Sequence, residues 1–508
     1  MGLGSANSEV RLCVFDLRRG QQEGQEVDKI LFFHPLDLPF STQLSVVGLS
    51  EGLITFTRIF SPEEACEVIE AERHTHVFYE AEPDIWMVMV VEKSNESEVV
   101  WRVDALRKVL KEVHSLFMMF HGSIRAMLER EPSGELLRSH LYPFIMDFLS
   151  DFLVGKKIQL PAFSDCLKER GTVQMLTVGR EAAIEVQSLA KVLESCAGTT
   201  PCYSLVMFHD LLVSTTLSPD DTINLFAYAV KRLTPSALSS GTSSWSYLRK
   251  GNSAIHAATG LSLAHSDPVI EQFRPRDIPP DRMSSCDVRR PLQHYRWSKG
   301  KDGFLVTDIW GTESGSTSFS TPTIWLRQTG EKMYLCTYQH KCLTLLLLIP
   351  VSSVLNGEQG VALVKKQVLE STSPKMLKVE EKLTKGWGGE NAYHVSGYRY
   401  LLVDNDSNYS RASPPVKVTT LTKESLLAMN KLREEVDLEK GRAKRDCRSD
   451  KDLEICIRAK NNAWVVARTT RERELYMVLE KANETLVYAS EAVEKFSNRY
   501  CGGTFSLD

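Results

Sequence analysis

A start of two strands followed by a helix recurs three times along this chain, and this recurrence limits the possible folds more than any other feature. Two runs with strand character, 10–17 and 29–33, precede a stretch at 41–60 whose apolar residues recur at spacings of three and four. The same order returns from Tyr203 and again from Tyr398. Because 508 residues exceed one ordinary domain of roughly 150 residues, we expect three α/β domains in tandem.

The first domain is expected over residues 8–154, in the order β-β-α-β-β-β-α-α. Three short runs after the helix at 41–60 are rich in Val, Ile, Phe and Tyr, which favour strands: Cys66–Glu70, Thr75–Tyr79 and Ile85–Val91. A helix at 103–128 then carries apolar residues on one face over about seven turns. The next helix, 135–153, contains Pro143, where we expect a kink or a break because proline lacks the backbone N–H.

The second domain is expected over residues 201–385, after a linker or helical connection at 155–200. Its first helix should begin at Ser218 and Pro219, because serine suits the N-cap and proline the first helical position. An insert at 236–302, rich in Ser, Gly and Pro, has too few periodic apolar residues for a packed element, so we expect a loop. The remaining expected elements are strands at 304–310, 323–327, 332–338 and 343–349 and a helix at 357–385.

The third domain is expected over residues 390–500, after a glycine-rich linker at 386–389. A highly charged tract at 440–452 is typical of a solvated loop. The expected elements are hairpin strands at 398–403 and 415–420, a helix at 422–439, strands at 453–457 and 463–469, and a helix at 476–496.

The composition argues against several functional classes. A formal net charge of −4 lacks the basic footprint of a nucleic-acid-binding protein, so we expect no nucleic acid as partner. The 11 cysteines include no C-x-x-C pair, which argues against a zinc site and against a disulfide framework. The most apolar run, Leu343–Ile349, is far shorter than the roughly 20 residues that cross a bilayer, so we expect any membrane contact to be peripheral.

Enzyme motifs are also missing from the sequence. It contains no G-x-x-x-x-G-K-[ST], H-E-x-x-H or G-x-S-x-G pattern. His74 and His76 would share one face of a strand as a metal pair, but no third ligand is near, and surface or half-buried histidines are the simpler interpretation. His34 and His209 stand at expected strand ends, where turn positions are favoured over a Cys-His or His-Asp catalytic pair. We therefore expect no catalytic, cofactor or metal site.

Three segments of the first domain are more specific than periodicity alone. They are FFHPLDLP at 32–39, VGLSEGLITFTRIFSP at 47–62 and HVFYEAEPDIWMVMVV at 76–91, and the long amphipathic helix follows them. Together they resemble the first longin domain of the calcium-caffeine-zinc-sensitivity (Ccz) family of vacuolar fusion proteins. The resemblance implies three tandem longin domains, each an antiparallel sheet of about five strands flanked by helices.

The same resemblance implies a heterodimer with the monensin-sensitivity (Mon-one) longin protein and guanine nucleotide exchange on a late-endosomal Rab GTPase of the Rab-seven class. It further implies recruitment from the cytosol to the prevacuolar compartment, late endosome and vacuole, with a Rab-five class GTPase and an anionic phosphoinositide membrane as recruiters. An exchange factor needs no chemical active site, because it works by binding the nucleotide-free GTPase more tightly than the loaded one. The alternatives are a longin tethering or adaptor subunit without exchange activity, and a hydrolase with a Cys-His pair.

Candidate partner-binding residues lie on the helix at 41–60. The apolar stripe of this helix, expected to pack on the sheet, consists of Val46, Leu49, Leu53, Phe56 and Phe60. The opposite stripe consists of Ser41, Ser45, Gly48 and Gly52. Two glycines cost a helix roughly 1 kcal/mol each against alanine, so close approach of a partner's helix is one explanation for them. The other explanation is tight packing within the domain itself.

Two further groups of candidates lie elsewhere. Pro83 and Trp86, near a turn with Phe78 and Tyr79, present either an apolar rim to a partner or ordinary core and turn packing. Aromatic and basic residues of the insert suit anionic lipid headgroups, with a solvated loop as the alternative. These membrane-contact candidates are Trp245, Tyr247, Leu248, Arg289, Arg290, Arg296 and Trp297.

Overall fold

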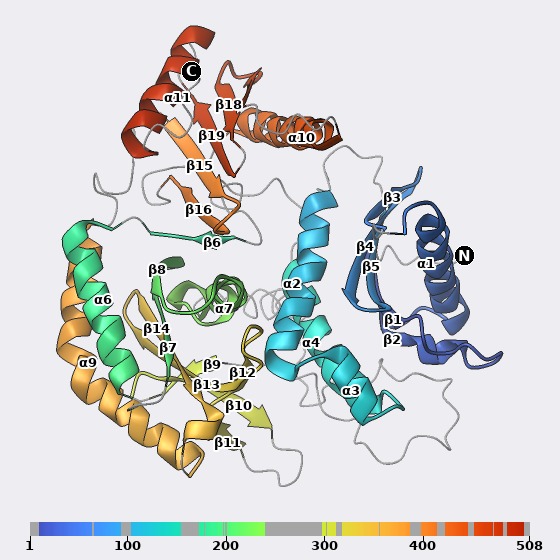
Figure 1. The fold of residues 1–508 in the computed structure, drawn as a ribbon, viewed down its shortest axis with the longest axis horizontal. Helices are drawn as coiled ribbons and strands as arrows, with labels where there is room; N and C mark the ends of the chain where they lie inside the picture. Colours follow the sequence, from blue (N-terminus) through green and yellow to red (C-terminus); the bar gives the residue numbers. More distant parts are fainter. Residues whose placement is uncertain are drawn as a thin grey trace, which may run out of the picture. The chain divides into compact units, whose positions relative to one another are not determined.

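A computed structural model describes residues 10–62, 66–92, 103–153, 172–176, 178–196, 198, 201–238, 297–300, 302–310, 317–354, 356–386, 398–413, 422–445, 452–470, 472–480 and 485–501. Described residues up to Leu153 form one compact unit, and those of 172–235 together with those from Trp297 onward form another. Within these residues lie two sheets of five strands, one of six and a small one of three (Figure 1). The expected α/β class, with three main sheets flanked by helices, is confirmed.

The first unit contains one antiparallel sheet with the strand order β2-β1-β5-β4-β3. Its strands are β1 (Val10–Asp16), β2 (Ile30–His34), β3 (Val68–Glu70), β4 (His74–Glu82) and β5 (Ile85–Glu92). Alternate residues of β1, which lies between β2 and β5, point to opposite faces. Leu12 and Val14 therefore join one apolar core, and Cys13 and Phe15 join another.

Helices cover both faces of this sheet (Figure 1). They are η1 (Glu26–Lys29), α1 (Phe40–Phe60), α2 (Val103–His121), α3 (Ile124–Arg130) and α4 (Glu135–Leu153). α1 contributes Val47 and Ile54 to the core on the side of Cys13 and Phe15. α2, α3 and α4 contribute to the core on the other side. The first sheet is thus buried on both faces, which explains why β5 is apolar along most of its length.

One expectation for these helices is wrong. The single helix at 103–128 is interrupted at Gly122, whose φ of +85° belongs to the left-handed region that favours glycine and ends α2. Ser123 then caps α3, because its side chain accepts a hydrogen bond from the backbone N–H of Ala126. At Pro143, where a kink or a break was expected, α4 continues without a break.

The second sheet has the strand order β12-β13-β14-β7-β8, and the three-stranded sheet has the order β11-β10-β9. The strands are β7 (Tyr203–Phe208), β8 (Leu211–Thr215), β9 (Trp297–Lys299), β10 (Leu305–Trp310), β11 (Thr317–Ser320), β12 (Thr323–Trp325), β13 (Lys332–His340) and β14 (Leu343–Pro350). β14 is buried at every position, as its leucine run predicts for a central strand covered on both faces.

The helices of this part are α6 (Arg180–Ser195), α7 (Pro219–Arg232), η3 (Val351–Ser353) and α9 (Glu358–Gly386). The predicted start of α7 is confirmed, since Ser218 caps it and Pro219 occupies its first turn. α6 forms where a linker or helical connection was expected, and its residues Val186 and Leu189 belong to the second core together with Val368 of α9. Residues 180–195 of the connection therefore form a packed helix.

The third sheet has the strand order β17-β18-β19-β15-β16-β6. Its elements are β6 (Val173–Gln174), β15 (Tyr398–Asp404), β16 (Tyr409–Ala412), α10 (Lys423–Arg445), β17 (Leu453–Arg458), β18 (Trp464–Thr469), β19 (Arg473–Leu479) and α11 (Leu486–Tyr500). Among the described helices of the chain, none combines the length and the apolar character needed to span a bilayer.

Three expectations for the third sheet need correction. β15 pairs with β16, whereas the expected partner strand at 415–420 lies outside the described residues. The charged tract at 440–452 is not all loop, because α10 continues to Arg445. The helix expected at 476–496 begins only at Leu486, since 476–479 belong to β19, which pairs with both β15 and β18.

Candidate partner-binding face on helix α1

The face of α1 that packs on the sheet differs from the one expected. Its buried residues are Gln43, Val47, Ser50 and Ile54, again at spacings of three and four. Beneath them the sheet presents large aromatic side chains, those of Phe15, Phe33, Phe78 and Trp86. Because the sheet supplies the bulk, the helix fits it with medium and small residues. The buried Ser50 hydroxyl remains satisfied, since it donates to the backbone oxygen of Val46 at 2.8 Å.

Of the stripe expected to pack on the sheet, Val46 and Leu53 pack against this core, and the other three residues are turned to solvent. Leu49 is 53% exposed, Phe56 59% and Phe60 74%, and Ile59 is 71% exposed beside them. Phe56 and Phe60 contact each other edge to face, with ring centroids 4.9 Å apart. With Phe40 at the first position of α1, which is 46% exposed, five large apolar side chains stand exposed on one helix, which is uncommon unless another surface covers them.

The small-residue stripe is exposed as well. Ser41, Ser45, Gly48 and Gly52 are all exposed. A Cβ added at Gly48 or Gly52 would meet nothing within 4 Å. The alternative in which these glycines allow tight packing within the domain is therefore wrong. The residues remain candidates for contact with another molecule.

The two sets of exposed residues form one continuous surface. Continuing the spacing of three and four from Ser41 through Gly52 leads to Phe56 and Ile59, with Leu49 and Phe60 beside this line. We call this surface the open face of α1; it consists of Ser41, Ser45, Gly48, Leu49, Gly52, Phe56, Ile59 and Phe60. Toward the N-terminus of α1 this face carries small residues, and toward the C-terminus it carries large apolar ones.

The two candidates near the β4–β5 turn have different environments. Pro83 is exposed, in keeping with a role at the surface. Trp86 is fully buried, and the Arg58 guanidinium lies over its ring at 5.4 Å from the centroid. Trp86 therefore presents no rim to a partner, and its selection as an interface residue is corrected. It supports α1 from below instead.

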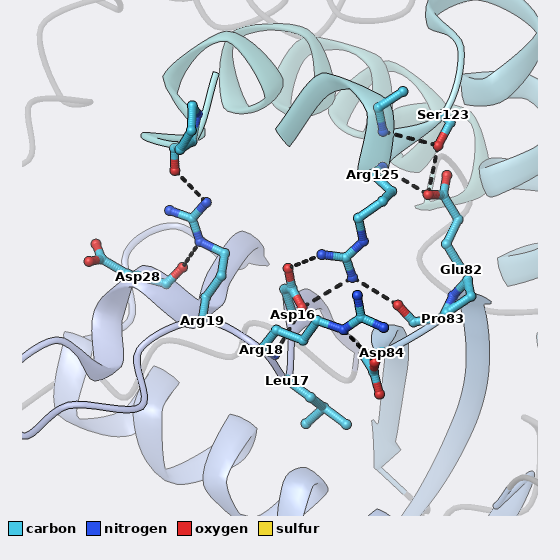
Figure 2. A network of polar contacts seen from close by, with 12 residues as sticks. Asp16, Leu17, Arg18, Arg19, Asp28, Glu82, Pro83, Asp84, Ser123 and Arg125 are labelled. Atoms are coloured by element: carbon cyan, nitrogen blue, oxygen red, sulfur yellow. Dashed lines mark hydrogen bonds and ion pairs between the residues drawn. The ribbon is translucent and has the colours of Figure 1, made fainter. Parts of the chain in front are cut away.

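A polar network fastens the β4–β5 turn to the start of α3 (Figure 2). The Arg125 side chain donates to Asp16 Oδ2 at 2.8 Å and to the backbone oxygen of Pro83 at 2.8 Å. Asp16 is 1% exposed, so this ion pair is partly withdrawn from water. Arg18 forms a more exposed pair with Asp84 at 2.6 Å.

Glu82 completes this network (Figure 2). Its carboxylate accepts hydrogen bonds from the Ser123 hydroxyl at 2.8 Å and from the backbone N–H groups of Ile124 and Arg125 at 2.7 and 2.8 Å. Burial by itself would raise the Glu82 pKa, but these bonds and the nearby His114 ring, whose Nε2 lies 3.6 Å from Glu82 Oε1, outweigh it, so the pKa lies below its usual value. An ionised carboxylate at the helix N-terminus fixes α3 to the sheet.

The membrane-contact candidates fall into two groups. Trp245, Tyr247, Leu248, Arg289, Arg290 and Arg296 lie outside the described residues. Trp297 begins β9, is only 7% exposed, and donates from its indole N–H to the Tyr228 hydroxyl at 2.8 Å. Since this side chain is buried and hydrogen-bonded within the protein, its selection as a lipid contact is corrected.

Residues that could bind a metal ion or act as nucleophiles are poorly arranged for either role within the described part of the chain. No group of three or more His, Cys, Asp or Glu side chains in them is arranged to hold a metal ion. The rings of His74 and His76 lie 6.5 Å apart on β4. Burial raises the pKa of Cys13, Cys336 and Cys456 to about 12 and that of Cys202 and Cys501 to about 11. These thiols stay protonated at neutral pH, which makes them poor nucleophiles for a Cys-His hydrolase.

Comparison with known proteins defines the class of the first unit. A family model described as the first longin domain of INTU, CCZ1 and HPS4 matches residues 11–122. The α1-covered sheet with its opposing helix α2 is therefore a longin domain.

The whole chain also matches curated proteins. It is 67% identical to the vacuolar fusion protein CCZ1 homolog B of Arabidopsis thaliana, with 100% of both chains covered. It is 61% identical to the vacuolar fusion protein CCZ1 homolog of Oryza sativa subsp. japonica, again with 100% of both covered. Identity to the homolog of Xenopus tropicalis is 23%, covering 99% of this chain and 98% of the other. The chain belongs to the family of vacuolar fusion protein CCZ1 homologs.

Proposed function

We propose that this chain is one subunit of a heterodimeric guanine nucleotide exchange factor that activates a Rab-seven class GTPase in endosome maturation and vacuole fusion. Its partner is a monensin-sensitivity (Mon-one) type longin protein. Full-length similarity to proteins named for vacuolar fusion supports this role. The observation that carries the subunit assignment is the open face of α1, which nothing described in this chain covers.

The physical properties of the open face suit a second helix. Gly48 and Gly52 have no atoms above them within 4 Å, so another backbone can approach closely there. Phe56 and Phe60 supply apolar area that an interface core requires. A helix retains two glycines at a cost of about 1 kcal/mol each when close approach offsets that cost. We therefore place the partner's longin helix on this face, with Pro83 as a further contact.

Exchange by this complex works through binding alone. The heterodimer holds the nucleotide-free GTPase more tightly than the loaded form, and that difference drives nucleotide release. No nucleophile or general base is required of this chain. The proposal includes division into longin domains at 8–154, 201–385 and 390–500. It also includes peripheral recruitment to late endosomes by a Rab-five class GTPase and anionic phosphoinositides, through the insert residues Trp245, Tyr247, Leu248, Arg289, Arg290 and Arg296.

Nucleotide release from purified Rab-seven class GTPase tests the exchange proposal. We expect the heterodimer to accelerate release of a fluorescent guanine nucleotide, and this chain alone to have little effect. A heterodimer that accelerates release from no late-endosomal Rab would overturn exchange. If it then binds the GTP-loaded Rab more tightly than the nucleotide-free form, the tethering or adaptor role is favoured instead.

A pair of glycine substitutions tests the open face of α1. Gly52→Leu places a side chain where the partner helix should approach, so we expect loss of the heterodimer in size-exclusion chromatography and loss of exchange. Gly441→Leu is the matched control, because Gly441 also lies in a helix with nothing within 4 Å of an added Cβ. Both variants gain helix propensity. Assembly of the Gly52→Leu chain with unchanged affinity would remove this face from the interface.

A further inference from the structure

Residues 172–176, just before α6, pair with two different sheets. We call this segment the coupling strand. β6, within it, runs parallel to β16 of the third sheet, with Val173 beside Tyr409 and Gln174 beside Ser410. The next residue, Met175, forms a parallel bridge with Leu212 of β8, the edge strand of the second sheet. Figure 1 draws β6 between β8 and β16.

Backbone hydrogen bonds leave the coupling strand in both directions. Toward the third sheet, the Val173 N–H donates to the Asn408 oxygen at 2.8 Å and the Met175 N–H donates to the Ser410 oxygen at 2.9 Å. Toward the second sheet, the Leu176 N–H donates to the Leu212 oxygen at 2.8 Å. Alternating directions of this kind are those of a strand with a neighbour on each side.

Side chains strengthen both attachments. The Thr172 hydroxyl donates to the Ser410 hydroxyl at 3.0 Å. Val173 is 1% exposed. Leu176 packs against the apolar core of the second sheet. A strand edge normally exposes unpaired N–H and C=O groups, and the coupling strand covers such groups on β8 and β16 at once.

We propose that the coupling strand makes the second and third sheets one mechanical unit, so that they open and move together. The strand continues directly into α6, which packs in the second core, and it reaches the third sheet through hydrogen bonds. Detaching the coupling strand, which is three to four residues of main chain, would therefore leave the second and third sheets free to move separately. This device is independent of the proposed exchange activity.

Substitutions at Met175 test the proposal. Met175→Pro removes the N–H that donates to Ser410, whereas Met175→Ala keeps the N–H and removes only side-chain atoms. Hydrogen exchange followed by mass spectrometry on the full chain reports on both neighbours of the strand. In the proline variant we expect exchange to become about tenfold faster in peptides covering 408–412 and 211–215, since backbone hydrogen bonds that hold the edges are lost. The alanine variant should resemble the wild type.

Three outcomes of this experiment would overturn the proposal. Unchanged exchange at 408–412 in Met175→Pro would show that the strand does not hold the third sheet. Equal acceleration in both variants would show that side-chain packing, not strand pairing, makes the connection. Loss of protection in β14, at the centre of the second sheet, would make the segment part of the folding core rather than a coupling device.

Discussion

Asp16 and Arg125 show how single charged residues hold the first longin domain together. Removing one partner of a partly buried pair leaves the other charge uncompensated, so we expect Asp16→Ala to lower the free energy of unfolding of this domain by about 3 kcal/mol. Urea denaturation followed by hydrogen exchange in α3 measures the change. Arg18→Ala removes the more exposed pair with Asp84, whose Arg18 side chain is 58% exposed, and should cost less than about 1 kcal/mol. If Asp16→Ala and Arg18→Ala lowered the free energy of unfolding equally, burial would not be what makes the Asp16–Arg125 pair the stronger one.

A second residue-scale prediction concerns the stacked rings of His121 and His140, whose centroids lie 5.0 Å apart between α2 and α4. Burial, reinforced by His140, lowers the His121 pKa to about 4. Because the folded pKa lies below the unfolded one, stability is full above about pH 6.5 and falls by about 1.4 kcal/mol per pH unit toward pH 4. Hydrogen exchange in α2 and α4 at pH 7 and pH 5 should show this loss. His121→Phe keeps an aromatic ring and should flatten the pH dependence.

At the scale of elements, two helical-region glycines have opposite roles. Gly122 ends α2 with φ +85°, a conformation that costs other residues about 1–2 kcal/mol, so Gly122→Ala should destabilise the first domain by that amount. Gly48 lies within α1 in open space, so Gly48→Ala should stabilise the same domain by about 0.5–1 kcal/mol. Urea denaturation of the two variants compares them. A stabilising Gly122→Ala would show that the break between α2 and α3 is not required.

At the scale of the whole molecule, the described residues divide into two compact units, although three main sheets are present. The second and third sheets lie in the same unit, and both pair with the coupling strand. We therefore expect calorimetry of the chain to show two unfolding transitions, one for each unit. Three separate transitions would mean that the second and third sheets unfold independently despite their shared strand.

The sequence by itself determined features that depend on near neighbours. Short runs rich in Val, Ile, Phe and Tyr located β4 and β5, and the Ser218-Pro219 pair located the start of α7. Helical spacing also placed Ser41, Ser45, Gly48 and Gly52 on one stripe, but it left open whether that stripe faces a partner or packs within the domain. Local patterns of this kind are set by chain geometry within a few residues, so they do not depend on how distant parts of the chain pack.

Only the tertiary structure decided the features that depend on distant residues. Tyr476 lies in β19 rather than in a helix, because an apolar run this short suits either element and pairing with β15 and β18 settles it. Both stripes of α1 have helical spacing, and the aromatic surface of the sheet selects the one with Val47 and Ile54. Trp86 is buried for the same reason. Short-range periodicity shows which residues share a face of an element. Packing against residues that are distant in the sequence determines which of these faces is buried.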